Sequence, residues 1–180
     1  TEDSFCCDID RIGDMLDLVK SESKQLIISE SCDMQITNST YRALIQWLRE
    51  HIVCDAAPVE PTMRFDATDG KLYVKINTAK KAEKRTLYVS YGEPSSCQRC
   101  WKSFDIKQKV GEHEYVCDVP VYDTEELIVA YASFQYPDSS VISTKVTGII
   151  PAKHDVQNVE TSPRISGIVY DGSMGSGEFV

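Results

Sequence analysis

The chain has 180 residues, of which 42% are hydrophobic and 26% are charged, a composition typical of a folded globular protein rather than of a disordered segment or a coiled coil. Its formal net charge is −9, from 19 basic and 28 acidic residues, and this excess of negative charge would repel nucleic acid. No apolar run reaches the roughly 18 residues that a membrane-spanning helix needs. We therefore expect a folded chain with no nucleic-acid partner and no membrane span.

The first third of the chain has the pattern of a helix, a strand and a second helix. Residues 8–20 place Ile9, Ile12 and Leu16 on one face of a short amphipathic helix. The second helix, which Ser39 or Thr40 can cap, carries one apolar stripe, formed by Tyr41, Leu44, Ile45, Leu48 and Ile52. We expect that stripe to face a core.

Between these helices, the run from Leu26 to Ile28 is apolar without alternation, which is typical of a strand buried on both faces in a parallel sheet. A single parallel strand would leave its backbone donors and acceptors unpaired. We therefore predict that its neighbours lie outside these 180 residues, in the rest of an α/β domain.

Pro58 and Pro61 end the helical pattern, and we place a domain boundary there. Seven runs rich in Val, Ile, Tyr, Thr and Phe follow, most of them alternating and separated by turn residues. This spacing predicts a seven-stranded antiparallel sandwich of the immunoglobulin or fibronectin type over residues 58–152. The lysine-rich segment around Lys80 and Lys84 is interpreted as a solvated hairpin tip.

Seven cysteines leave at least one thiol without a partner in the chain. Cys97 and Cys100 form a single CxxC, and zinc sites of the ribbon type need a second close pair, which is absent from the sequence. We predict no cofactor and no metal, with a redox or metal role for these two thiols as the alternative. Metal analysis and thiol titration would distinguish these possibilities.

The aromatic side chains of the predicted strands have two interpretations. At alternating strand positions they fill a sandwich core, and on an exposed face they could stack on sugars. We expect core positions for most of the set, which comprises Tyr73, Tyr88, Tyr91, Trp101, Phe104, Tyr115, Tyr131, Phe134 and Tyr136. Loss of glycan binding on Trp101→Ala would favour the second interpretation.

The order of elements over residues 1–54 resembles the C-terminal end of an α/β-hydrolase. The segments DIDRIGDMLDLVK, KQLIISES, SCDMQIT and TYRALIQWLREHI correspond to its helix, last strand, histidine loop and closing helix. The resemblance implies that Asp3 stands at the position of the catalytic acid and Met34 at that of the histidine. A thioether cannot transfer a proton, and no GxSxG motif supplies a nucleophile, so the segment alone is predicted to be inactive.

These expectations give an α+β chain in three parts: a helix-strand-helix segment of an α/β-hydrolase-like domain at 1–57, the immunoglobulin-like sandwich at 58–152, and a tail or further β module at 153–180. The main hypothesis is a non-catalytic C-terminal fragment of a multidomain hydrolase-like protein. Its sandwich would be an accessory module, and its partner an upstream hydrolase core of the same protein. The alternative is a sandwich that binds a glycan or protein ligand. The run LIVAYASFQYPDSSVISTKVTGI resembles the final hairpin of sandwich modules in bacterial multidomain hydrolases, and this resemblance favours an extracytoplasmic or cell-associated location.

Overall fold

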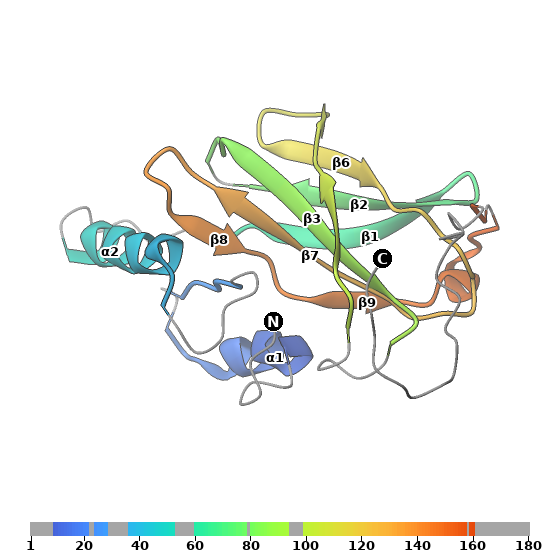
Figure 1. The fold of residues 1–180 in the computed structure, drawn as a ribbon, viewed down its shortest axis with the longest axis horizontal. Helices are drawn as coiled ribbons and strands as arrows, with labels where there is room; N and C mark the ends of the chain where they lie inside the picture. Colours follow the sequence, from blue (N-terminus) through green and yellow to red (C-terminus); the bar gives the residue numbers. More distant parts are fainter. Residues whose placement is uncertain are drawn as a thin grey trace, which may run out of the picture.

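The computed structural model describes residues 9–21, 24–28, 36–52, 60–78, 80–93, 99–157 and 159–160. This part of the chain is α+β, with two antiparallel sheets stacked face to face and two helices beside them (Figure 1). Its elements are α1 (Ile9–Leu18), α2 (Asn38–Ile52), β1 (Thr62–Thr68), β2 (Lys71–Asn77), β3 (Lys84–Tyr91), β4 (Lys102–Asp105), β5 (Gln108–Lys109), β6 (Glu114–Asp118), β7 (Ile128–Gln135), β8 (Val141–Ser143), β9 (Thr147–Ile149) and the short 3-10 helix η2 (Pro151–His154). Neither helix is long and apolar enough to cross a membrane.

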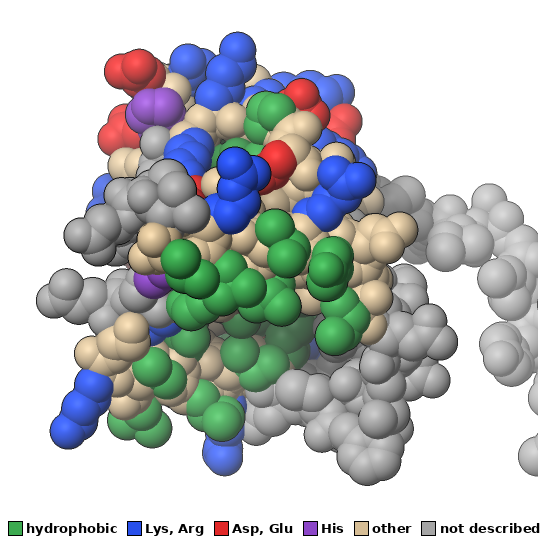
Figure 2. All heavy atoms as spheres, turned by 90° about the vertical axis from the view of Figure 1, so that its left-hand side faces the viewer, with side chains coloured by type: hydrophobic (Ala, Val, Ile, Leu, Met, Phe, Trp, Pro, Cys, Tyr) green, Lys and Arg blue, Asp and Glu red, His purple; other side chains and the backbone are tan. Residues whose placement is uncertain are grey.

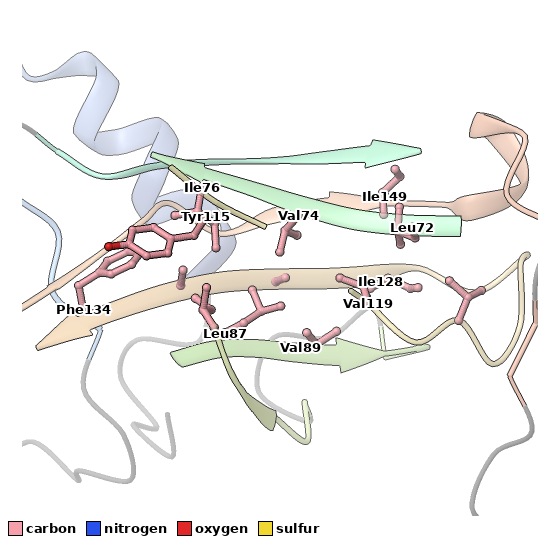
Figure 3. Packing of buried hydrophobic residues seen from close by; sticks show 14 of the residues in the cluster. Leu72, Val74, Ile76, Leu87, Val89, Tyr115, Val119, Ile128, Phe134 and Ile149 are labelled. Atoms are coloured by element: carbon pink, nitrogen blue, oxygen red, sulfur yellow. The ribbon is translucent and has the colours of Figure 1, made fainter. Parts of the chain in front are cut away.

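The first sheet has the strand order β1-β2-β6-β5, and the second has the order β4-β3-β7-β8 with β9 also paired to β7. Alternation along the strands points one set of apolar side chains into the space between the sheets. Figure 3 shows that space filled by Val74 and Ile76 from one sheet and by Leu87, Val89 and Phe134 from the other. These five side chains are at most 2% exposed, so they form the main core.

Nine strands occupy the described residues, where seven were predicted, because two of the predicted runs are each divided. The run WKSFDIKQK pairs with β3 as β4, turns inward at Ile106, which is 2% exposed, and continues as β5 in the other sheet. The last run is divided between β8 and β9 at Thr144, whose hydroxyl accepts a hydrogen bond from the Ala132 amide at 2.9 Å. Side-chain hydrogen bonds of this kind compete with the ladder and interrupt a strand.

The outer face of the second sheet is partly covered by α1 and residues 24–28. Tyr88 and Tyr131 point outward from β3 and β7 and stack with their ring centroids 4.8 Å apart. Ile9, Leu26 and Ile28 pack with these rings in a second buried cluster. The amphipathic face of α1 is therefore buried against the sandwich.

The expectation that Leu26 to Ile28 requires an upstream parallel sheet is wrong. The Leu26 carbonyl accepts a hydrogen bond from the Ser143 amide at 2.9 Å, and the Ile28 amide donates to the Ser143 hydroxyl at 3.0 Å. The segment therefore pairs part of its backbone with Ser143 at the edge of β8, inside the same chain. Its apolar side chains are covered by the tyrosines of the sheet, not by neighbouring parallel strands.

The N-terminal half of α1 is also held by an ion pair. The Arg99 guanidinium donates two hydrogen bonds to the Asp10 carboxylate, one of them from Nη2 to Oδ2 at 2.6 Å. The Arg99 side chain is 1% exposed, and its Nε also donates to the Glu93 carbonyl at 3.2 Å. This arrangement links α1 to the loop between β3 and β4.

The second helix is attached with its polar side inward, which is the reverse of the prediction. Ala43 and Glu50 are its buried residues, whereas the predicted core stripe lies at the surface. The Glu50 carboxylate accepts hydrogen bonds from Lys80 and, at 3.0 Å, from Gln46. Burial acts to raise the pKa of the Glu50 carboxyl, but these hydrogen bonds outweigh it and leave the pKa below its ordinary value.

We expect this pair to make the fold more sensitive to acid. Because the folded-state pKa of Glu50 is depressed, its contribution is complete above the unfolded pKa of about 4.3 and is lost as the pH falls through the lower folded value. Both proteins should become less stable when the pH is lowered from 6 to 3. The decrease in the free energy of unfolding should be about 0.5–1 kcal/mol smaller for Glu50→Gln than for the native chain. Urea unfolding at both pH values measures this difference. Equal losses in the two proteins would contradict the assigned role.

Candidate binding groove

A groove of about 460 Å³ lies on the outer face of the second sheet, beside the start of α2. We call it the polar groove. Its lining consists of Ile28, Thr37, Asn38, Ser39, Arg42, Lys84, Thr86, Tyr88, Ser133, Gln135, Ser139 and Val141. Figure 1 shows α2 standing at the end of the sandwich where β8 and the start of β3 lie.

The floor of the polar groove comes from two neighbouring cross-strand rows of the sheet. Lys84 of β3 lies opposite Gln135 of β7, and Thr86 lies opposite Ser133. The next row toward the helix α1 pairs Tyr88 with Tyr131 and is covered. One face of the sheet is thus divided into an apolar part under α1 and a hydrogen-bonding part beside α2, where Lys84 is exposed and Ser133 and Gln135 are partly exposed.

The wall of the polar groove is the first turn of α2, whose cap lies two residues before Ser39 and three before Thr40, the two predicted caps. Thr37 is the cap: its hydroxyl accepts a hydrogen bond from the Thr40 amide at 3.2 Å. The hydroxyls of Ser39 and Thr40 lie within 2.9 and 2.8 Å of the same oxygen. These contacts fix the turn, so Asn38 and Arg42 stand at the rim in a defined position.

The charge of the polar groove is opposite to that of the chain. Its lining includes the cations Lys84 and Arg42 and no carboxylate, whereas the whole chain has a net charge of −9. Arg42 also donates from Nη1 to the Asp138 carbonyl at 3.2 Å, which holds its side chain at the rim. Amide, hydroxyl and cationic groups around an open hollow can hydrogen-bond to hydroxyl groups and anionic oxygens of a ligand.

The predicted hairpin tip of basic residues has several roles in the structure. Lys80 pairs with Glu50, and Lys84 lines the polar groove. Arg85 donates to the Ala82 carbonyl at 2.9 Å and lies 4.9 Å from the centroid of the Tyr115 ring. The sequence pattern gave no indication of this division, because it depends on which strand face each residue occupies.

Several predicted site residues lie outside the described residues, namely Asp3, Met34 and Cys97. Cys100, the second thiol of the CxxC, is a free cysteine at an exposed position. Burial raises the pKa of the other described thiol, Cys117, so it is less reactive than an ordinary cysteine at neutral pH. Within the described residues no group of three or more potential ligands could hold a metal ion.

The prediction that most strand aromatics occupy core positions is confirmed. Tyr88, Tyr115, Tyr131, Phe134 and Tyr136 are buried. Trp101, the residue chosen above to test sugar stacking, is half-buried and packs edge-on against Tyr131 with the ring centroids 5.0 Å apart. Its replacement would therefore disturb the cluster under α1. Among the described residues, the polar groove offers hydrogen-bonding groups rather than an exposed aromatic platform.

No family model and no curated protein matches this chain. Among solved structures, a carbohydrate-binding module family 56 β-1,3-glucan binding domain aligns with 51% of this chain and 99% of its own, at 5% identity and a TM-score of 0.39. A bromine derivative of BhCBM56 aligns with 51% of this chain and 91% of its own, at 6% identity and a TM-score of 0.41. Pectate lyase Pel3 from Pectobacterium carotovorum aligns over 52% of this chain and 28% of its own, at 10% identity and a TM-score of 0.40. These similarities assign neither a ligand nor an activity, and nothing in them supports the predicted resemblance to α/β-hydrolases.

Proposed function

We propose that this chain is a non-catalytic β-sandwich module that binds a carbohydrate in the polar groove. The observation that carries the proposal is the pair of rows formed by Lys84 with Gln135 and by Thr86 with Ser133, in which Lys84, Gln135 and Ser133 are accessible and Thr86 is 6% exposed. Within the described residues no hydrogen bond within the chain occupies the Lys84 and Gln135 side chains, so both are available to a ligand. Sugar hydroxyls pair with amides and hydroxyls of this kind.

The preferred ligand in this proposal is a saccharide with carboxylate or sulfate groups. Lys84 on the floor and Arg42 at the rim can each donate a charge-assisted hydrogen bond to an anionic oxygen. Because no carboxylate lines the polar groove, such an oxygen would meet no direct repulsion there. A neutral saccharide would use only the hydroxyl and amide groups and would bind more weakly.

We also propose that residues 9–28 belong to the same module as the sandwich, in place of an upstream hydrolase domain. Support comes from the hydrogen bonds between residues 26–28 and Ser143 and from the shared cluster around Tyr131.

The sandwich itself is proposed to have immunoglobulin-like strand order. In the immunoglobulin fold, one sheet contains strands A, B, E and D and the other contains strands C, F and G. Here β1-β2-β6-β5 corresponds to the first sheet and β3-β7-β8 to the second, with β4 as an added edge strand.

A glycan array with neutral, uronic-acid and sulfated oligosaccharides tests the proposed function on the full chain. We expect acidic glycans to give the strongest signals, and titration calorimetry of one of them should show about tenfold weaker binding for Lys84→Gln and for Gln135→Ala. Lys107→Gln, whose side chain is 83% exposed away from the lining residues, is the matched control and should bind normally. The proposal is wrong if no glycan binds, or if all three variants bind like the native chain.

A further inference from the structure

The outer side of α2 carries an apolar stripe whose side chains are exposed to between about one third and three quarters of their surface. Its members and their exposed fractions are Tyr41 57%, Leu44 46%, Ile45 40%, Leu48 36% and Ile52 78%. Figure 2 views this end of the molecule and shows hydrophobic side chains gathered on its surface, with basic side chains beside them. Contiguous exposed apolar surface of this kind marks an interaction site. We call these five residues the α2 stripe.

The basic residues of α2 lie along one flank of the α2 stripe. Arg42 follows Tyr41 and Arg49 follows Leu48, so the two guanidinium groups are two turns apart on the same side. The opposite flank carries Trp47 and His51, whose ring centroids are 4.1 Å apart. The helix therefore presents apolar groups with a single line of positive charge.

A shallow hollow of about 480 Å³ lies beside that charged flank. Its lining combines the stripe residues Tyr41 and Ile45 with Arg42, Arg49, Asn38, Gln46 and Asp138. The Asp138 carboxylate accepts hydrogen bonds from the amide and hydroxyl of Ser140, at 2.9 and 2.6 Å, within its own turn. Both bonds go to Oδ1, so Asp138 keeps its negative charge, and with Arg42 and Arg49 the hollow has an excess of one positive charge, which favours a carboxylate on the ligand.

The spacing of the α2 stripe suits a helix as the occupant. Tyr41, Ile45, Leu48 and Ile52 recur at alternating steps of four and three residues, which is the seam by which two helices pack side by side. A second copy of this chain is disfavoured, because antiparallel pairing of two such helices would bring Arg42 near Arg49 of the other copy, and two chains of net charge −9 repel. An anionic bilayer would favour cations along both flanks, whereas α2 carries its arginines along one.

We propose that the α2 stripe and its hollow form a docking surface for an amphipathic helix of another protein, with acidic side chains along one edge of its apolar face. The α2 stripe provides the contact area, and the two arginines determine the orientation of the bound helix and the specificity for acidic partners. The interface of one short helix is small, so the complex is transient, with a dissociation constant on the order of micromolar.

A displayed library of randomised 21-residue helical peptides, selected on the full chain, tests this inference. The selected peptides should converge on an apolar stripe with Asp or Glu enriched on one flank. For such a peptide, fluorescence anisotropy should show about tenfold weaker binding to Arg49→Glu and no measurable binding to Leu48→Asp. Exchanging the peptide's acidic residues for lysine should restore its binding to Arg49→Glu.

Arg49 and Leu48 do not line the polar groove, so both variants should keep glycan binding, and their circular dichroism and urea unfolding should match the native chain. Lys153→Glu, an exposed substitution in η2, is the matched control for charge and should bind the peptide normally. Peptides without acidic enrichment, or peptides that bind all the variants equally, would overturn the proposal. So would phosphatidylglycerol vesicle binding, or dimerisation in sedimentation equilibrium, that Leu48→Asp abolishes.

Discussion

Phe134→Ala is expected to lower the free energy of unfolding by about 3–5 kcal/mol, the range for removing a fully buried aromatic side chain. Phe134 is 0% exposed and points from β7 into the space between the sheets (Figure 3). Its neighbours across the strands, Arg85 and Ile142, are fixed by the ladder, so they cannot move inward to fill the cavity. Urea unfolding followed by circular dichroism measures the change.

The matched control is Leu44→Ala, which removes an apolar side chain of similar hydrophobicity from the α2 stripe. Leu44 is 46% exposed, and leucine and alanine are both good helix formers, so its unfolding free energy should stay within about 0.5 kcal/mol of the native value. A loss for Leu44→Ala comparable with that of Phe134→Ala would mean that the stripe is part of the core, and the docking proposal would fail with it.

Asp10→Ala is expected to lower the free energy of unfolding by about 2–3 kcal/mol, which is more than the partial exposure of the Asp10 side chain suggests. The Asp10 side chain is 36% exposed, but its partner Arg99 is 1% exposed, and this buried guanidinium would lose the two hydrogen bonds that it donates to the carboxylate. Removing one partner of a buried pair is costly for this reason, and the partial exposure of Asp10 places the value below the full range for buried pairs. Urea unfolding gives the magnitude, and amide exchange in α1 shows whether that helix detaches first.

Asp14→Ala is the control for this variant, because Asp14 lies one turn further along α1 at an exposed position. It should change stability by no more than about 0.5 kcal/mol. If Asp10→Ala and Asp14→Ala had the same small effect, the link between α1 and the sandwich would not depend on the ion pair. The proposal that residues 9–28 belong to the sandwich module would then rest on the apolar contacts of Leu26 and Ile28 alone.

The polar groove could not be predicted from the sequence, although the strands around it could. Thr86, Ser133 and Gln135 follow an ordinary strand alternation, and nothing in that alternation tells which outward residues will be covered. The answer depends on where residues 24–28 cross the sheet, a contact between segments more than 100 positions apart. Lys84 likewise became a groove residue because β3 and β7 place it opposite Gln135.

Local patterns in the sequence were sufficient for the two helices, for most strands and for an antiparallel sandwich, because periodicity and turn residues act over short distances. They could not decide the partner of an apolar segment. Leu26 to Ile28 have the composition of a central parallel strand, yet they lie on the edge of β8, where Ser143 hydrogen-bonds to the Leu26 carbonyl and the Ile28 amide. The α2 stripe has the spacing of a core helix, yet the contact of Ala43 and Glu50 with the sandwich turns it outward. Hydrophobic side chains require burial but do not specify against which surface, and that choice is made only when the whole chain packs.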